Sequence, residues 1–334
     1  MSEIDTTEST SEPLFTSRID LAPFSQTVEK ISTEIKKVII GQDEIIDLLM
    51  ISILANGHVL LEGVPGVAKT MLAKSLAKAL QIGFSRIQFT PDLMPSDVLG
   101  TSIFNPTTAK FDFKEGPIFS QLILIDEINR APAKTQSALF EVMEERQITI
   151  DGKRHIMKAP FIVIATQNPV EQEGTYRLPE AQLDRFLFKL EMGYPEVVHE
   201  VDMLESFHER KGSDPLDSLN SIITGEEIAE AQQVINSIHL DKNLMEYIVQ
   251  IVNSTRVNKD IFLGASPRAS LNIMHAGKAA AAMSGRDFVT PEDIQLVSIH
   301  VLKHRIILAP EKEMEGATPQ DVIKKLIGTI EIPR

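Results

Sequence analysis

The stretch Gly63-Val64-Pro65-Gly66-Val67-Ala68-Lys69-Thr70 decides which fold this chain can adopt. An apolar run over residues 58–62 predicts a buried strand before it, and apolar residues at helical spacing over 70–81 predict a helix after it. A strand, a glycine-containing turn and a helix that begins at Lys-Thr direct backbone N–H groups and the positive helix end toward phosphate oxygens. The stretch therefore predicts a phosphate-binding loop.

The residues of this loop have separate expected roles. Lys69 would contact the β- and γ-phosphates of a nucleoside triphosphate, and Thr70 would offer its hydroxyl to Mg²⁺. Ala68 stands where glycine is usual, and alanine tolerates helical dihedral angles well, so the loop can form if this residue is right-handed helical. An ordinary glycine-rich turn is the alternative interpretation. The remaining residues expected to bind the nucleotide are Gly63, Val64, Pro65, Gly66, Val67 and Met71.

Two carboxylates end a second apolar segment, residues 121–126 and the residue after it. An apolar run of this kind predicts a strand buried between helical layers, so polar chemistry is expected at its carboxyl end. Asp126 would hold the Mg²⁺ shell, and Glu127 would orient and deprotonate an attacking water. The alternative is that the two acids merely begin the next loop, but the phosphate loop upstream favours the catalytic interpretation.

A third apolar segment, residues 161–166, ends shortly before Asn168. A neutral amide at the carboxyl edge of the sheet could position the water against the γ-phosphate by hydrogen bonding. An asparagine that precedes proline often forms a turn instead. Its place after a third apolar strand favours the functional role for Asn168.

Composition limits the classes of function. The chain has 334 residues, a formal net charge of −14 and no cysteine. The length allows two domains, and the negative charge argues against a non-specific nucleic-acid binder. The lack of cysteine excludes disulfides, thiolate metal sites and cysteine nucleophiles. The acidic start has no apolar signal region, and no apolar segment is long enough to cross a bilayer, so we expect a cytoplasmic protein without membrane insertion.

The predicted elements divide the chain into three parts. Residues 1–22 form an acidic tail that is expected to be disordered. Residues 23–193 alternate strands and helices, which predicts a parallel sheet with helices on both faces, and residues 194–334 carry only helical patterns. Hairpins are predicted over 101–114 and 146–156, and the sequence favours neither partner contact nor simple exposure for them. The predicted strands are 58–62, 86–90, 121–126, 161–166 and 186–191.

Five longer segments carry a more specific pattern: residues 126–139 (DEINRAPAKTQSAL), 143–152 (MEERQITIDG), 165–176 (ATQNPVEQEGTY), 178–186 (LPEAQLDRF) and 264–269 (GASPRA). Together they resemble the MoxR family of AAA+ ATPases, and the resemblance extends over residues 39–306. That family also carries alanine before its loop lysine, so Ala68 supports the resemblance. The implied fold is α/β, a P-loop AAA+ parallel-sheet (αβα) domain followed by a smaller all-α lid domain.

The resemblance implies further site residues. Arg185 resembles the arginine finger that acts on the ATP of a neighbouring subunit, although the residues alone are equally compatible with an ion pair to Asp184. Arg268 resembles the sensor 2 arginine of the lid, and it stays open whether it serves its own subunit or a neighbour. Gly41 and Gln42 resemble part of the adenine pocket.

The resemblance also implies partners: ATP and ADP, a homo-oligomeric ring that is commonly a hexamer, and a protein client such as one with a von Willebrand factor A domain. The leading hypothesis is Mg²⁺-dependent ATP hydrolysis that drives chaperone-like remodelling of a protein. The alternatives are a nucleic-acid motor of the ring-helicase type and a low-turnover assembly switch. His300 and His304 have a spacing that can hold a metal, but without a third ligand nearby we expect a structural helix face.

Overall fold

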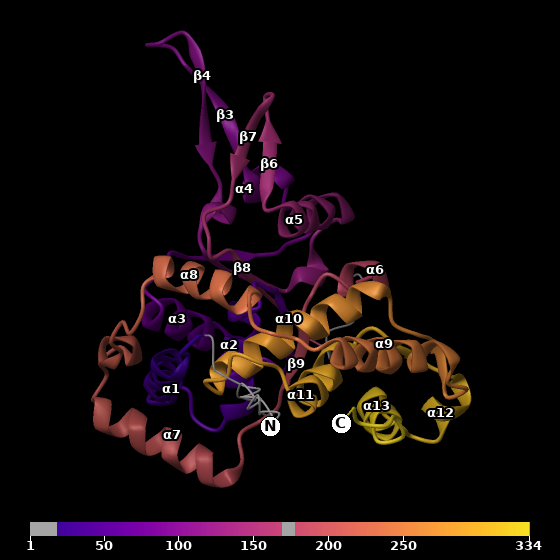
Figure 1. Ribbon diagram of the computed structural model, residues 1–334. Coiled ribbons are helices and arrows are strands. Elements are labelled where there is room, and N and C mark those ends of the chain that lie inside the picture. The colour runs from indigo at the N-terminus through magenta and orange to yellow at the C-terminus, as the bar shows by residue number, and fades with distance from the viewer. Residues whose placement is uncertain (1–18, 169–177, 334) are drawn as a thin grey trace, which may run out of the picture.

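The computed structural model describes residues 19–168 and 178–333 (Figure 1). The acidic tail predicted for residues 1–22 lies almost wholly outside the described residues, and its last residue begins α1 (Ala22–Lys36). α2 (Asp43–Leu54) follows α1, and both helices pack into one core with the central sheet.

Five parallel strands form the central sheet in the order β2-β5-β8-β1-β9. All five predicted strands are present with small shifts of their ends, and their parallel arrangement is confirmed. Because parallel strands end at the same edge, the residues after β1, β5 and β8 lie side by side. The strands are β1 (Val59–Gly63), β2 (Phe84–Gln88), β5 (Leu122–Asp126), β8 (Ile162–Gln167) and β9 (Phe188–Met192).

Successive side chains of the three central strands, β5, β8 and β1, point into different cores. In β1, Val59 and Leu61 join the core that contains α1, α2 and α3 (Lys69–Ala79), whereas Leu60 joins the core that contains α5 (Ala133–Glu145). A period of two with both faces buried is typical of a sheet between helical layers. The predicted αβα architecture is therefore confirmed.

Two hairpins project together from the sheet and form an arm (Figure 1). They are β3 (Gly100–Asn105) with β4 (Lys110–Glu115) and β6 (Gln147–Ile150) with β7 (Lys153–Ile156). Asp151 and Gly152 both have positive φ, as a two-residue type I′ hairpin turn requires. Ser102 donates a hydrogen bond to Asp151, and the ring of Phe113 lies 4.4 Å from that of His155, so the hairpins contact each other.

Helices make up most of the remaining chain. α8 packs against α2, where Gln232 donates to Ile53 O at 2.7 Å, so the helical region and the sheet region share one core. The longer helices are α7 (Val197–Arg210), α8 (Gly225–Asn236), α9 (Lys242–Val257), α10 (Pro267–Met283), α11 (Pro291–Leu302) and α13 (Pro319–Ile327). The short ones are α4 (Pro95–Leu99), α6 (Glu180–Leu183), α12 (Pro310–Met314), η1 (Pro117–Phe119), η2 (Ile128–Arg130) and η3 (Pro215–Ser218).

One part of the helical region differs from the prediction. Only helical patterns were predicted over residues 194–334, but α11 (Pro291–Leu302) is followed by β11 (Ile307–Leu308), which pairs with β10 (Ile261–Leu263). Arg305 explains the change, because its buried side chain donates to carbonyl oxygens of the sheet region and draws the chain out of the helical path. The lid is therefore not entirely helical.

α7 is a helix whose apolar side faces water. None of its 14 residues is buried, and Val197, Leu204 and Phe207 are 79%, 67% and 70% exposed. α7 lies against the chain near Gly41, which has φ 74°. A Cβ on Gly41 would be only 2.7 Å from the imidazole ring of His199 on α7. Gly41 is thus needed for the approach of α7.

Candidate active site

The phosphate loop turns through two residues with positive φ, Gly66 and Ala68. Ala68, the N-cap residue of α3, has φ 62° and ψ 24°, which is the left-handed region, so the loop forms without the right-handed conformation that we had set as its condition. Gly66 also has a positive φ, 91°. These residues reverse the chain so that α3 begins at Lys69, and the conformation of Ala68 costs about 1 kcal/mol. Lys69 Nζ folds back along the loop and donates to Gly63 O at 2.5 Å.

The loop forms a wall of a cavity of about 510 Å³ at the carboxyl edge of the sheet, the nucleotide cavity. Residues predicted from three separate segments meet there: Lys69 and Thr70 from the loop, Asp126 and Glu127 from the end of β5, and Asn168 after β8. The other lining residues are Pro65, Gly66, Val67, Ala68, Met71, Lys74, Arg86, Gln88 and Thr166. Two residues of the predicted loop lie outside this lining: Gly63 ends β1, and Val64 packs against the core.

Side chains of neighbouring strands hold the two carboxylates. Arg86 on β2 donates from Nε to Asp126 Oδ2 at 2.6 Å, and the Thr166 hydroxyl on β8 donates to Asp126 Oδ1 at 3.1 Å. Gln88 on β2 donates from Nε2 to Glu127 Oε2 at 2.8 Å. The directions of both carboxylates are therefore restrained by contacts within the chain.

Our sequence reasoning missed four residues of this cavity, Lys74, Arg86, Gln88 and Thr166. Arg86 and Gln88 are two residues apart in β2, so their side chains share one face of the sheet, and Gln88 pairs in register with Asp126. The spacing of Arg86 and Gln88 could be read from the sequence. Their contact with the two carboxylates could not, because it depends on β2 lying beside β5, and no local pattern specifies the strand order.

The donor set fits Mg²⁺ and a nucleoside triphosphate. Mg²⁺ prefers oxygen ligands and usually takes only one or two carboxylates from the protein. The cavity offers the Thr70 hydroxyl and the Asp126 carboxylate for this purpose. Lys69, Lys74 and Arg86 line the same cavity, and their positive charges suit a polyphosphate.

A smaller cavity of about 180 Å³ shares Gly66, Val67 and Ala68 with the nucleotide cavity. Its lining is mostly apolar, which suits a flat heteroaromatic base, and Gln42 adds an amide that can hydrogen-bond to ring nitrogens. Gly41 does not line it. The other lining residues are Val38, Ile39, Ile40, Tyr194, Pro195, Glu200 and Met203, the last two from α7.

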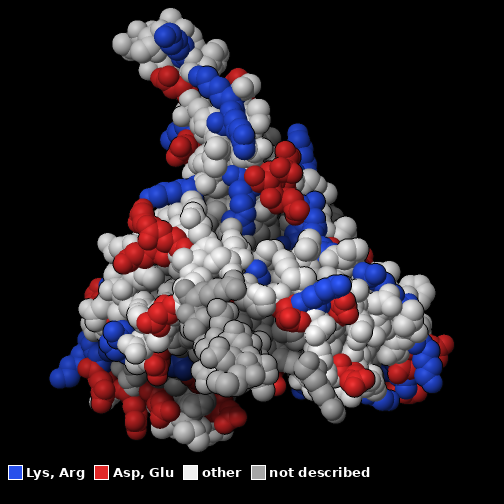
Figure 2. All heavy atoms as spheres, in the orientation of Figure 1, with Lys and Arg blue, Asp and Glu red and all other residues white. Residues whose placement is uncertain are grey.

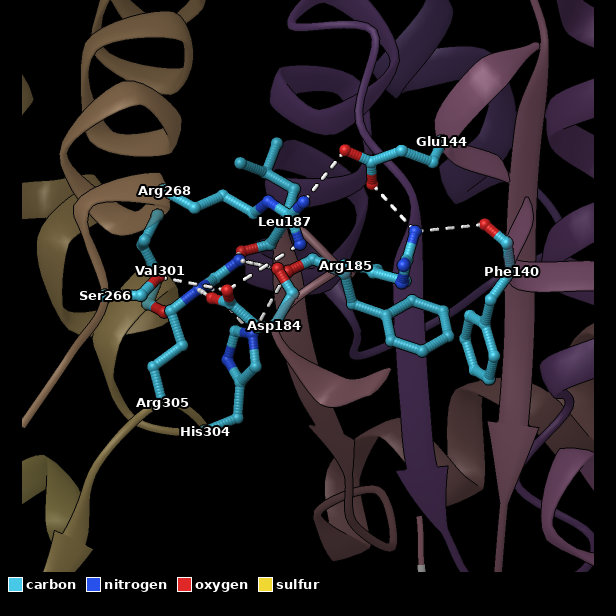
Figure 3. Close-up of polar contacts among 11 residues, drawn as sticks. Phe140, Glu144, Asp184, Arg185, Leu187, Ser266, Arg268, Val301, His304 and Arg305 are labelled. Atoms are coloured by element: carbon cyan, nitrogen blue, oxygen red, sulfur yellow. Dashed lines mark hydrogen bonds and ion pairs between the residues drawn. The ribbon is translucent and has the colours of Figure 1, made fainter. Parts of the chain in front are cut away.

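The two predicted arginines lie elsewhere, in a cavity of about 370 Å³ that Arg146 also lines, the arginine cavity. It shares no lining residue with the nucleotide cavity. Arg185, which follows α6, donates to Glu144 Oε2 at 3.0 Å, and Arg268 at the start of α10 donates to Glu144 Oε1 at 2.8 Å (Figure 3). The structure thus brings Arg185 and Arg268 to one carboxylate, away from the phosphate loop of their own chain.

Asp184 has partners other than Arg185 among the described contacts. It accepts hydrogen bonds from Arg305 Nε at 2.8 Å and from the Ser266 hydroxyl at 3.0 Å (Figure 3). Arg305 is almost completely buried, and burial lowers the pKa of its guanidinium to about 10, which still leaves it charged at neutral pH. Arg305 therefore ties the helical region to the segment that carries Arg185.

His300 and His304 have separate structural contacts. His300 on α11 packs edge-on against Phe188, and His304, which lies beyond the end of α11, places Nε2 3.1 Å from Phe186 O. Within residues 19–168 and 178–333, no group of three or more His, Asp or Glu side chains could hold a metal ion.

Known proteins share this architecture. Residues 58–188 match the model of the ATPase family associated with various cellular activities (AAA), and residues 253–326 match that of the AAA lid domain. The chain is 42% identical over 323 residues to Chaperone MoxR1 of Mycobacterium tuberculosis, an alignment that covers 94% of this chain and 84% of that protein. The chain belongs to the MoxR family of AAA+ ATPases.

Two other similar proteins extend over most of this MoxR-family chain. YeaC of Bacillus subtilis, described as uncharacterized, is 47% identical over 299 residues, which are 90% of this chain and 92% of YeaC. A crystal structure from Cytophaga hutchinsonii, of a protein to which ATPase activity is ascribed, has a TM-score of 0.86 and 40% identity, and covers 94% of this chain and 97% of that one. The predicted family and AAA+ fold are confirmed.

As a MoxR-family AAA+ protein, the chain is a nucleotide-binding ATPase. In the part of the chain that the structure describes, every helix is too short or too polar to span a membrane.

Proposed function

We propose that this MoxR-family ATPase uses Mg²⁺-dependent ATP hydrolysis to remodel or activate a protein partner, in the manner of a chaperone. The observation that supports this most directly is the separation of two cavities in one chain. The nucleotide cavity contains the loop lysine and the carboxylates, whereas the arginine cavity contains the candidate finger. A complete hydrolytic site therefore needs two copies of the chain, as a cooperative motor does.

Within the nucleotide cavity each residue would have one task. Lys69 and the N–H groups at the start of α3 would bind the phosphates. Thr70 and Asp126 would hold Mg²⁺, whose charge would offset that of the phosphate oxygens. Glu127 would accept the proton of the attacking water, and Asn168 would orient that water. Gln42 in the adjoining apolar cavity would contact the adenine, while Gly41 would allow α7 to close beside it.

A neighbouring copy would supply the arginines. Arg185 would neutralise negative charge on the transferring phosphoryl group, and Arg268 would contact the γ-phosphate. Both arginines donate to Glu144 and line one cavity, so we place Arg268 with Arg185 on the neighbour's nucleotide and not on its own. Such a contact joins two different faces of successive copies, and it forms a ring when the rotation from copy to copy closes on itself. Family membership favours a hexamer.

The arm of the two hairpins is the proposed contact for a protein client. Phe104 and Phe111 on the arm are 51% and 67% exposed and pack edge to face, 5.4 Å apart. Exposed aromatic side chains on a projecting element are typical of protein-binding surfaces. The name of the relative MoxR1 as a chaperone also supports a protein client, and a protein with a von Willebrand factor A domain is one candidate.

Glu127→Gln tests the proposed hydrolysis. We expect ATP affinity to be kept and turnover to fall by about 100-fold or more, because the amide keeps the size of the side chain but cannot accept a proton. Phosphate release and equilibrium binding of a fluorescent ATP analogue would measure the two quantities. Glu141→Gln, an exposed change on α5, is the matched control. Normal turnover by Glu127→Gln would show that this residue is not the base.

One observation favours a second candidate, a nucleic-acid motor. Basic side chains run along the arm (Figure 2), whose hairpins carry Lys110, Lys114, Lys153 and Arg154. Cations among exposed aromatic side chains are typical of single-stranded nucleic-acid binding. ATPase activity that single-stranded DNA stimulates, and that salt suppresses, would favour this candidate over the protein client.

A further inference from the structure

Glu144 makes contacts that the proposed mechanism does not yet use. Its two carboxylate oxygens accept hydrogen bonds from two different arginines, Oε2 from Arg185 Nη1 at 3.0 Å and Oε1 from Arg268 Nη2 at 2.8 Å (Figure 3). Arg185 follows α6 in the sheet region, and Arg268 is the second residue of α10 in the helical region. The Glu144 carboxylate on α5 therefore brings together two cations that are 83 positions apart in sequence and belong to different parts of the fold. Arg268 Nη1 also lies 3.7 Å from Asp184 Oδ2, a longer contact than the one to Glu144.

The backbone around Glu144 is itself held in place. The carbonyl oxygen of Met143, one residue earlier, lies 3.1 Å from Nε2 of the buried His58. Arg146, two residues later, has φ 51°, ends α5 and donates from its guanidinium to the side-chain and main-chain oxygens of Asn56. These contacts on both sides leave Glu144 little freedom to shift along the rim of the arginine cavity.

Arg185 keeps nitrogen atoms available for a ligand. Both of its contacts, to Glu144 and to Phe140 O at 3.2 Å, use the same atom, Nη1. Among the described residues, the structure places no acceptor on its Nε or Nη2. Arg185 can therefore be held by Glu144 and at the same time donate to a phosphate, since a guanidinium carries five N–H groups.

We propose that Glu144 is a positioning residue, which gathers Arg185 and Arg268 into one pair and presents that pair to the nucleotide of a neighbouring copy. Two guanidinium groups this close repel each other, and a carboxylate between them offsets the repulsion and sets their directions. An amide does not replace it, because it is neutral and only its oxygen can accept. This inference depends on the proposed action of the arginines in trans.

The proposed role of Glu144 can be tested by substitution without unfolding the chain. The side chains of Glu144, Arg185 and Arg268 are 40%, 30% and 37% exposed, so their ion pairs contribute little to stability and Glu144→Gln should fold. Glu145→Gln is the matched control, because Glu145 is the next residue of α5 and has no ion pair within the described part of the chain.

The experiment mixes two disabled forms of the full chain. The acceptor carries Arg185→Ala and Arg268→Ala and keeps its nucleotide cavity, whereas the donor carries Glu127→Gln and keeps its arginines. Turnover in the mixture then comes from acceptor nucleotide activated by donor arginines. Glu144→Gln is placed first in the donor and then in the acceptor, and kcat and KM for ATP are measured with Mg²⁺ present.

We expect Glu144→Gln in the donor to lower kcat of the mixture by about 10-fold with little change in KM, since the loss of one charged hydrogen bond has that size. In the acceptor it should change nothing, because no arginines remain there for it to hold. Glu144→Asp in the donor should restore part of the rate. Equal loss in both positions, or no loss in the donor, would overturn the role of Glu144. No turnover in the mixture without Glu144→Gln would instead overturn the action in trans.

Discussion

The nucleotide cavity and the arginine cavity contain the two halves of one proposed reaction, yet they are constructed differently. The nucleotide cavity forms where β1, β5 and β8 end, and parallel pairing alone brings those ends to the same edge. The arginine cavity forms between the end of α5, the residues after α6 and the start of α10. Its shape therefore depends on how the helical lid packs against the sheet. A movement of the lid would change the arginine cavity and leave the nucleotide cavity intact.

The largest expected effect is a loss of turnover, without a loss of ATP affinity, when the arginine cavity is changed. Arg185→Ala should lower kcat by about 1,000-fold, the usual contribution of an arginine finger. The ATP affinity of dilute protein should stay the same, because Arg185 lies outside the nucleotide cavity of its own chain. Phosphate release and ATP-analogue binding measure both quantities, with Arg185→Lys as the charge-preserving control. Loss of ATP affinity in dilute Arg185→Ala would contradict the division between the cavities.

Lys69→Ala should lower the ATP affinity, which Arg185→Ala leaves unchanged. We expect ATP affinity to fall by about 100-fold, since charge-assisted hydrogen bonds worth about 3 kcal/mol are lost. Lys74→Ala, in the same cavity, should have a smaller effect. The Lys69→Ala protein should still supply arginines, so mixing it with Arg185→Ala protein should restore turnover. If the mixture stays inactive, the two cavities do not meet between copies.

Arg305→Met should weaken the attachment of the lid without touching either ligand site. It leaves Asp184 and several carbonyl oxygens without their buried donor, and we expect a loss of about 3 kcal/mol in the free energy of unfolding. Urea unfolding followed by circular dichroism would measure this. Lys312→Met, which removes an exposed pair with Glu315, should change little. ATP affinity of the folded Arg305→Met protein should be normal, whereas turnover should fall.

The smallest expected effect is a pH dependence from His58, which also lines the arginine cavity. Its Nδ1 accepts from Val163 N at 3.0 Å, and burial lowers its pKa from 6.5 to about 3. The unfolded chain therefore binds a proton below pH 6.5 that the folded chain does not bind until about pH 3. The stabilisation by neutral His58 is complete above pH 6.5 and is lost progressively as the pH falls toward 3. Urea midpoints between pH 7.5 and 4.5 should show this slope, and His58→Gln should reduce it.

Most residues that line the nucleotide cavity could be picked out from the sequence because each part of the cavity has a local signal. The phosphate loop, the pair Asp126-Glu127 and Asn168 each follow an apolar run, and a parallel sheet must bring such ends together. The left-handed conformation of Ala68 was not foreseen, because φ depends on how the loop meets α3 and not on residue preference alone. Arg86 and Gln88 were missed because the strand order was unknown.

The arginine cavity was predictable only through resemblance, and then only in part. Arg185 and Arg268 were identified from family motifs, whereas Glu144 was not, because it is one of several acids on the exposed side of α5. Only the packing of α10 against the sheet region distinguishes it. The β10–β11 pair was missed for a related reason: strands this short carry no period, and the contacts of Arg305 end the helical pattern.

The arm has a mechanical consequence. The hydrogen bond between Ser102 and Asp151 and the tilted ring contact of Phe113 with His155 join its two hairpins, so they should move as one stiff lever. A strand of six residues is about 20 Å long, and a tilt of about 10° at its base sweeps the far end through roughly 3–4 Å. β6 begins two residues after α5, close to Glu144, so a small rotation there would be amplified at Phe104 and Phe111.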